Sequence, residues 1–144
     1  MAVLARAPRE DLKAMLDQAL GTTPVPAHEW LRAPETGLAM VRARIGGTGD
    51  AFNLGEVTVT RATLRLRMSD GSAPVGVAVQ MGRDKERATL AALIDAMLQV
   101  SAFEAALHER VIEPLAARIA GRREEKAAQA AQTKVEFFTM VRGD

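Results

Sequence analysis

The chain has 144 residues, enough for one domain with a modest hydrophobic core, and its formal net charge of +1 provides no general attraction to nucleic acids or membranes. Apolar residues make up 48% of the sequence but aromatic residues only 3%, so Ala, Leu, Val and Met must supply most of the packing. The chain has no cysteine, which excludes disulfides, thiol catalysis and an iron–sulfur cluster held by its own side chains.

Near the N-terminus, apolar side chains recur at the spacing of one helix face. They predict an amphipathic helix that Gly21 ends, and they are Leu12, Met15, Leu16, Ala19 and Leu20. Three prolines, at positions 24, 26 and 34, then predict an extended segment around Trp30. From residue 39 to residue 45, apolar and polar side chains alternate, which predicts a half-buried strand.

Two further strands are predicted, each after a turn. Gly46-Gly-Thr-Gly-Asp50 predicts the first turn, and the β-prone run of residues 52–68 follows it. The apolar residues of this run change parity midway, which predicts a bulge or bend near Thr60 or Arg61. A turn at residues 69–72 precedes a third strand with alternating Val75, Val77 and Val79, so we expect an antiparallel sheet.

The sequence becomes helical after the third strand. Asp84 can cap a helix that runs to about Val100, and a second helix is predicted from about Phe103. Pro114 either kinks this second helix or opens a new one. The Ala-rich, charged stretch of residues 116–132 is strongly helix-prone, but its apolar face is thin, which predicts weak anchoring to a single domain.

The C-terminal residues 133–144 are unusually apolar for a chain end. Their large apolar side chains are Val135, Phe137, Phe138, Met140 and Val141. Burial of one such side chain stabilises a protein by about 1.5–3 kcal/mol, so we expect this tail to dock on its own body or on another subunit. The expected fold is α+β, a single domain of residues 1–144 with an N-terminal helix, a small antiparallel sheet, C-terminal helices and an extended apolar tail.

The glycine-rich turn is one candidate anion-binding site. The backbone amides of Gly46, Gly47 and Gly49 could cradle a phosphate group. Phosphate loops normally lead into a helix, whereas a strand is predicted here, and no Gly-Lys-Ser/Thr sequence follows. A tight turn that needs positive φ angles is the simpler interpretation.

A second candidate anion site lies at the predicted start of the helix after residue 82. Arg83 and Lys85 would stand beside the free N–H groups and the positive end of the helix dipole. The alternative is that Asp84 caps the helix and that its basic neighbours are solvated.

Arginine dominates the basic residues, with 15 Arg against 4 Lys, a bias that a GC-rich genome would also produce. Arg61, Arg65 and Arg67 share one strand parity, and Arg42 and Arg44 share a face of the preceding strand. If these faces coincide, the sheet carries an arginine-lined surface for acidic groups or polyphosphate. An ordinary solvated face is the alternative.

We find no self-contained catalytic apparatus and expect no catalytic residue on this chain. His28 and His108 lie far apart without ligand spacing around either, so no metal is expected. Neither a Ser-His-Asp signature nor a paired-carboxylate context is recognisable. The sequence contains no apolar run of membrane-spanning length and no signal peptide, so we expect a cytoplasmic protein.

Several motifs, in order along nearly the whole chain, resemble the PhnG subunit family of bacterial carbon–phosphorus lyase. They are Arg32-Ala-Pro-Glu-Thr-Gly-Leu38, Arg42-Ala-Arg-Ile-Gly-Gly-Thr-Gly-Asp50, Phe52-Asn-Leu-Gly-Glu56, Thr58-Val-Thr-Arg-Ala62, Gly82-Arg-Asp-Lys85 and Val135-Glu-Phe-Phe-Thr-Met-Val-Arg-Gly-Asp144. The glycine-rich block and the C-terminal motif are jointly quite specific.

The resemblance implies an organising, non-catalytic subunit of a hetero-oligomeric complex in phosphonate catabolism, with PhnH, PhnI, PhnJ and PhnL as partners. That complex is expected to displace adenine from MgATP with an alkylphosphonate, giving a ribose 1-phosphonate 5-triphosphate. MgATP would then be a substrate of the complex, and no cofactor is expected on this chain. Two other hypotheses remain: direct binding of triphosphate or phosphonate by Arg83 and Lys85, and a stand-alone anion- or nucleotide-binding regulatory module.

Overall fold

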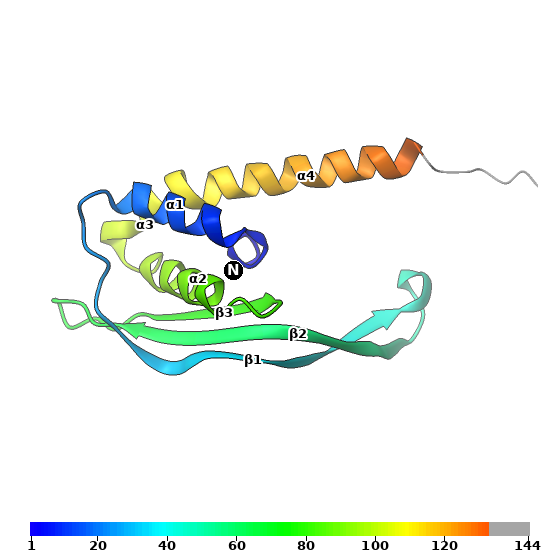
Figure 1. The fold of residues 1–144 in the computed structure, drawn as a ribbon, viewed down its shortest axis with the longest axis horizontal. Helices are drawn as coiled ribbons and strands as arrows, with labels where there is room; N and C mark the ends of the chain where they lie inside the picture. The colour runs from blue at the N-terminus through cyan, green and yellow to red at the C-terminus, as the bar shows by residue number, and fades with distance from the viewer. Residues whose placement is uncertain (133–144) are drawn as a thin grey trace, which may run out of the picture.

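The structure, a computed structural model, describes residues 1–132, which form an α+β fold with the helices on one face of a sheet (Figure 1). The described residues contain one antiparallel sheet of three strands in the order β1-β2-β3. Its strands are β1 (His28–Arg44), β2 (Ala51–Leu66) and β3 (Val75–Met81). The fold class expected from the sequence is confirmed for this part of the chain, and the tail at residues 133–144 lies outside it.

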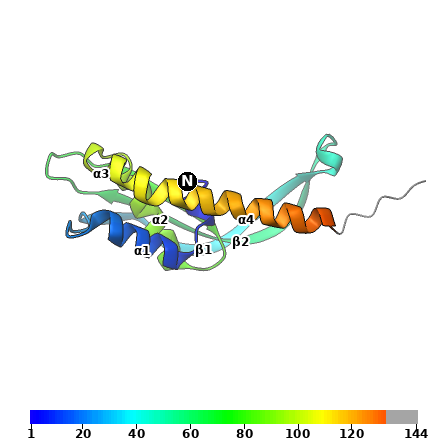
Figure 2. The same ribbon diagram turned by 90° about the horizontal axis from the view of Figure 1, so that it is seen from above.

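The helices form two layers over the sheet. Helix α2 (Lys85–Met97) packs directly on the strands, and α1 (Arg9–Leu20) and α4 (Glu113–Gln132) lie above it (Figures 1 and 2). Short elements complete the fold: η1 (Leu4–Arg6), η2 (Ile45–Gly47), α3 (Ser101–Leu107) and the π-helical turn η3 (His108–Ile112). Pro114 stands in the first turn of α4, directly after the π-helical turn η3, and the helical backbone runs on from Ser101 to Gln132, so Pro114 does not open a separate helix.

The core lies between the sheet and the helices. From β2 come Ala62, Leu64 and Leu66, each fully buried. They pack in one apolar cluster with residues from η1, α1, α2 and the later helices, including Leu4, Leu12, Leu16, Ala88, Ala92, Ile94, Met97, Leu107, Val111 and Leu115. The predicted apolar face of the first helix is therefore confirmed, and Gly21 ends that helix with a φ of 57°.

Helix α2 approaches β3 closely because both surfaces carry small side chains. The buried positions of β3 are Gly76, Ala78 and Gln80, while Val75, Val77 and Val79 alternate onto the opposite face. A Cβ atom on Gly76 would lie 1.9 Å from the carbonyl oxygen of Ala92, which is far inside van der Waals contact. Glycine at this position is therefore what allows the helix to reach the sheet.

The β1–β2 hairpin is much longer than β3. Strand β3 pairs with β2 only between Val59 and Arg65, whereas β1 pairs with β2 along nearly its whole length. Residues 37–58, which we call the hairpin arm, therefore continue beyond the three-stranded part as a two-stranded ribbon. The hairpin arm and the C-terminal part of α4 leave the body in the same direction (Figures 1 and 2).

The irregularity predicted near Thr60 or Arg61 is present beside Arg61, but the extra residue lies on β1. Glu35 pairs with Arg61 and Arg32 with Thr63, so β1 gains one residue there, whereas the pairing of β2 with β3 runs through this region without a shift. The register shifts lie between Trp30 and Glu35 of β1 and between Val41 and Arg42, opposite Leu54. The parity change in the sequence also coincides with the place where β2 passes from the three-stranded body into the hairpin arm.

Strand β1 is also longer than predicted. The segment around Trp30, expected to be merely extended, pairs with β2 from His28 onward, and Pro34 sits in the irregular part of this edge strand. At the opposite edge, Asp95 Oδ2 accepts a hydrogen bond of 3.0 Å from the Val77 amide. Gln99 Nε2 donates to the Val75 carbonyl at 2.7 Å, so α2 and the residues after it cover the first half of the β3 edge.

Among residues 1–132 no single helix is both long enough and apolar enough to cross a membrane. Only α2 taken together with residues 101–132 meets such a criterion, as a pair bent by 120°.

Candidate subunit interface

The hairpin arm exposes large apolar side chains that water should disfavour. Leu38 is 61% exposed, Leu54 is 64% exposed and Ile45 at the tip is 77% exposed. Met40 and Phe52 are also exposed. The pairing Thr36↔Thr60 places Leu38 and Met40 on the face of the ribbon that continues the helix-covered face of the sheet.

A two-stranded ribbon in water is marginally stable unless a third layer covers it. No helix of the described chain packs on the hairpin arm, so its apolar side chains lack that layer (Figure 1). Exposed apolar patches of this kind mark sites of protein association. The arm is therefore the strongest candidate for a surface that another chain covers.

The sequence held one signal for this arm that the strand prediction missed. Residues 38–41, Leu-Ala-Met-Val, are apolar on both parities, whereas a half-buried strand alternates. Simple alternation from residue 39 would place Met40 on the polar face with Arg42 and Arg44. A strand that is apolar on both faces instead indicates a second covering layer.

The outer face of the sheet is a second uncovered surface. Val77, Val79 and Met81 form an exposed apolar row on β3, and Met81 is 69% exposed. No described helix lies on this side (Figure 1). Beside the row, Arg61 contacts Glu35 at 3.4 Å, which places charged pairs between the apolar residues and the β1 edge.

The ion pairs at the other end of this face surround Glu29. Arg67 Nη2 donates to Glu29 Oε2, and Arg65 Nη1 lies 3.3 Å from Glu29 Oε1. The hydrogen bond from Arg67, with the charges of both arginines, holds the pKa of the Glu29 carboxyl below its ordinary value. The acidic partner of these arginines is thus internal to the chain.

The predicted arginine-lined surface is wrong in its geometry. Arg42 and Arg44 lie on the same parity of β1 as Thr36, which pairs with the buried Thr60, whereas Arg61 lies on the opposite parity of β2. The two sets therefore face opposite sides of the sheet. Arg61, Arg65 and Arg67 are, in addition, already paired with glutamates.

Helix α4 is weakly anchored, as its thin apolar face predicted. Leu115 is its one buried residue in the described chain, and Ile119 is half-buried. Arg118 Nη1 contacts Asp11 Oδ1 of α1 at 3.2 Å and adds a second attachment. Beyond residue 119 the helix leaves the body in the same direction as the hairpin arm (Figures 1 and 2).

The glycine-rich segment forms the tip of the hairpin arm. Gly46 and Gly47 have φ angles of 60° and 80°, which L-amino acids with side chains rarely adopt. The Gly49 amide donates to the Ile45 carbonyl at 3.0 Å, and Arg44 Nη1 donates to the Gly49 carbonyl at 3.0 Å. These contacts account for the glycines as a tight turn, and phosphate binding at the tip stays a prediction.

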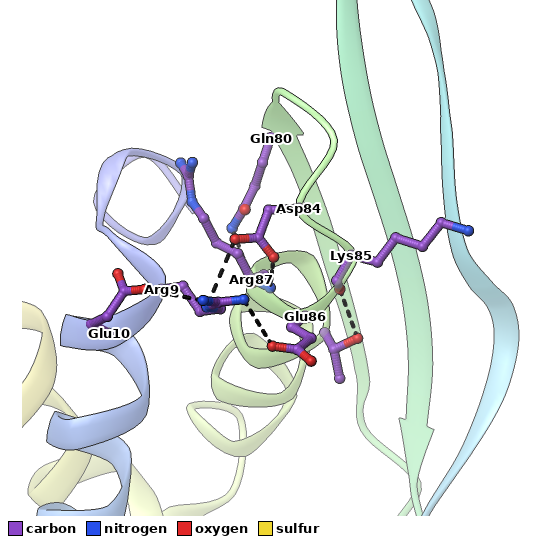
Figure 3. A network of polar contacts seen from close by, with 8 residues as sticks. Arg9, Glu10, Gln80, Asp84, Lys85, Glu86 and Arg87 are labelled. Atoms are coloured by element: carbon purple, nitrogen blue, oxygen red, sulfur yellow. Dashed lines mark hydrogen bonds and ion pairs between the residues drawn. The ribbon is translucent and has the colours of Figure 1, made fainter.

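The start of α2 is capped by the chain itself. Asp84 Oδ1 accepts a hydrogen bond of 2.9 Å from the Arg87 amide, as the capping prediction required. Arg9 Nη1 lies 3.0 Å from Glu86 Oε2, and Arg9 Nε lies 4.0 Å from Asp84 Oδ2 (Figure 3). Lys85 points away from this network (Figure 3). Anion binding by Arg83 and Lys85 stays a prediction, because Asp84 already occupies the capping position.

Metal ligands do not gather in the described part of the chain. No group of three or more His, Cys, Asp or Glu side chains there could hold a metal ion. The interface residues predicted at the C-terminus lie outside the described residues: Val135, Phe137, Phe138, Met140 and Val141.

Comparison with known proteins identifies a matching family and a curated relative of this chain. The model of the family described as "Phosphonate metabolism protein PhnG" matches residues 1–143. A curated relative from Rhizobium meliloti (strain 1021), the alpha-D-ribose 1-methylphosphonate 5-triphosphate synthase subunit PhnG, is 48% identical over 147 residues. The match covers 100% of this chain and 87% of the relative.

Proposed function

Because the chain belongs to the PhnG family of phosphonate metabolism proteins, we propose that it is the organising subunit of a ribose 1-methylphosphonate 5-triphosphate synthase. In this role it contributes surfaces that hold partner subunits together and no catalytic residue of its own. The partners are PhnH, PhnI, PhnJ and PhnL. The complex, which acts in the cytoplasm, displaces adenine from MgATP with an alkylphosphonate.

The hairpin arm is the observation that carries this proposal. Leu38 and Leu54 project from a ribbon that no described helix covers, and each exposes more than half of its surface. Stable subunit interfaces are large and more apolar than the average surface. A partner that packs on the arm would remove these side chains from water and supply the layer that the ribbon lacks.

The chemistry of the described residues supports a role without catalysis. Their charged side chains are mostly exposed, several stand in surface ion pairs, and the lowered pKa of Glu29 comes from its hydrogen bond with Arg67 and from the charges of Arg67 and Arg65. A buried, strongly perturbed acid or base in a concave site would be expected of a subunit that performs the reaction itself.

Co-expression with tagged PhnI tests the proposal. Wild-type chain and the double variant Leu38→Ser, Leu54→Ser are each captured through the tag and quantified by mass spectrometry. We expect the wild type to co-purify and the variant to be lost from the complex roughly tenfold, because two apolar anchors are removed.

A matched control is Val25→Ser in the loop before β1, which replaces another exposed apolar residue away from the arm. It should co-purify like the wild type. Circular dichroism should show that every variant is folded. If the arm variant is captured as well as the wild type, or if the wild-type chain is not captured at all, the proposed function is wrong.

A further inference from the structure

We infer that four basic side chains between η1 and α4 bind a triphosphate group, and this inference rests on the proposed function. They border a pocket of about 230 Å³ on the surface. Its lining residues are Arg6, Ile119, Arg122, Arg123 and Lys126. The pocket is separate from the hairpin arm and from the start of α2.

Two elements far apart in sequence form this basic pocket. Arg6 is the last residue of η1, and the other lining residues belong to α4. Positions 119, 122, 123 and 126 follow the spacing i, i+3, i+4 and i+7, so they share one face of the helix. The fold therefore adds the N-terminal arginine to a basic helix face.

The backbone beneath Arg6 is firmly held. Leu4 and Ala7, which flank the turn, are both fully buried. Arg87 of α2 donates a hydrogen bond from Nη2 to the Ala5 carbonyl. On the other side of the pocket, Arg118 contacts Asp11 of α1 at 3.2 Å, one turn before Arg122. A ligand would thus meet Arg6 on a firmly held backbone and the other three basic groups on the turns of α4 that follow its last contact with the body.

The basic side chains of this pocket have no ion-pair partner within the described chain. No carboxylate lines the pocket itself, and the carboxylates of Glu124 and Glu125, next to Arg123 on α4, line the adjoining surface without an ion pair to any of the four basic groups. Arg9 and Arg118 close by do have acidic partners. Arg122 and Lys126 are like charges at i, i+4, which repel each other, so a bound anion would relieve an unfavourable arrangement.

A polyphosphate suits this set of groups better than a single carboxylate does. Arginine binds phosphate oxygens with two parallel N–H donors, and the pocket offers three arginines and a lysine for one short chain of negative charges. Ile119 is the single apolar residue in the lining, so a base or sugar would gain little here. The name of the relative contains a triphosphate, which is a ligand of this class.

The start of α2 offers a less suitable place for the same group. Asp84 already occupies the capping position of α2 by accepting from the Arg87 amide, and Lys85 points away from the network that Asp84 and Glu86 form with Arg9 (Figure 3). The two basic regions can therefore be separated by substitution.

Calorimetric titration of the full chain with inorganic tripolyphosphate tests the inference. We expect saturable binding that weakens with added salt, because exposed charges are screened. Arg6→Gln together with Arg122→Gln should weaken binding by roughly tenfold or more, since one donor group is lost from each side of the pocket. Arg110→Gln, which removes an exposed arginine elsewhere, and Arg83→Gln should leave the affinity unchanged.

Capture by tagged PhnI is measured on the same proteins and separates this inference from the proposed function. The Arg6, Arg122 double variant should still be captured. Absence of tripolyphosphate binding by the wild type, or an equal loss in Arg110→Gln, would overturn the inference. So would a double variant that keeps its tripolyphosphate affinity but is no longer captured, because the pocket would then bind an acidic segment of a partner protein.

Discussion

The backbone of β3 at Gly76 touches the backbone of α2 at Ala92 so closely that an added Cβ atom would lie 1.9 Å from the Ala92 carbonyl oxygen. The same Cβ would lie 2.7 Å from the Ala96 amide nitrogen. Both neighbours are helix backbone and cannot move independently. The distance between the sheet and α2, on which the central core depends, is thus set by one missing side chain.

Gly76→Ala should destabilise the protein by at least about 1–3 kcal/mol, because α2 must shift away from the sheet to admit the methyl group. Thermal unfolding followed by circular dichroism measures the effect. Gly121→Ala in α4 is the matched control. No atom lies within 4 Å of the Cβ position there, so the higher helix propensity of alanine should stabilise the chain by about 0.5–1 kcal/mol. Equal midpoints for the two variants would contradict this account of the packing.

Removal of the cap on α2 should have a smaller effect. Asp84→Ala deletes the acceptor of the Arg87 amide and should lower the free energy of unfolding by about 1 kcal/mol. Asp84→Asn keeps an acceptor oxygen and removes the charge, so it should retain most of the stability. Urea denaturation of the three proteins distinguishes capping from the weak contact with Arg9: if Asn is as destabilising as Ala, the charge matters more than the cap.

Thr60 joins the sheet to the turn before α2. Its buried hydroxyl donates to the Gly82 carbonyl at 2.7 Å and lies 3.2 Å from the Thr36 hydroxyl. Thr60→Val has nearly the same shape but leaves these groups without their partner, and it should cost about 1–3 kcal/mol of stability. Thr60→Ser keeps the hydroxyl and should be less damaging. If urea denaturation shows Thr60→Ser to be less stable than Thr60→Val, the methyl group of Thr60 matters more for stability than its hydroxyl.

Glu29 should make stability depend on pH on the acid side. Its pKa in the folded protein lies below the ordinary 4.5, chiefly through the hydrogen bond from Arg67. The contribution of ionised Glu29 to the free energy of unfolding is therefore fully present above the unfolded-state pKa, and it is lost as the pH falls from about 4.5 through the folded-state pKa. Thermal midpoints between neutral pH and pH ~3 should fall more steeply for the wild type than for Glu29→Gln.

A direct titration of Glu29 supplies the control for that prediction. In Arg67→Gln, NMR of the Glu29 carboxyl group should give a pKa closer to the ordinary value than in the wild type. Arg83→Gln, in the connection between β3 and α2 and with no ion pair to Glu29, should leave the Glu29 pKa unchanged. An unshifted Glu29 in Arg67→Gln would assign the effect to other charges.

The elements of the body were predictable because their signals are local. The spacing of Leu12, Met15 and Leu16 predicts one buried helix face, and all three are in the core. Asp84 caps α2 because its carboxylate accepts a hydrogen bond from the Arg87 amide. The valines of β3 were recognised as a strand but suggest the wrong buried face. Gly76 and Ala78 are buried instead, since α2 approaches too closely for valine, and that closeness is a tertiary property.

The candidate interface was only partly predictable. The thin apolar face of α4 was evident from its composition, and the structure confirms that Leu115 is its single buried residue in the described chain. The hairpin arm was not foreseen, because strand length depends on where β3 stops pairing, between Val59 and Arg65. Likewise, the sequence alone does not predict that Arg6 lies beside α4. Contacts of this kind depend on how elements that are distant in sequence pack together.

Asp95 and Gln99 keep other strands away from the outer edge of β3. An exposed strand edge acts as a template on which foreign or identical chains can add, and the result is aggregation. Here the Val77 amide and the Val75 carbonyl are occupied by side chains from the helical side of the same molecule. An incoming strand would first have to displace both contacts. These two side chains therefore disfavour sheet growth at this edge before the chain has bound its partner subunits.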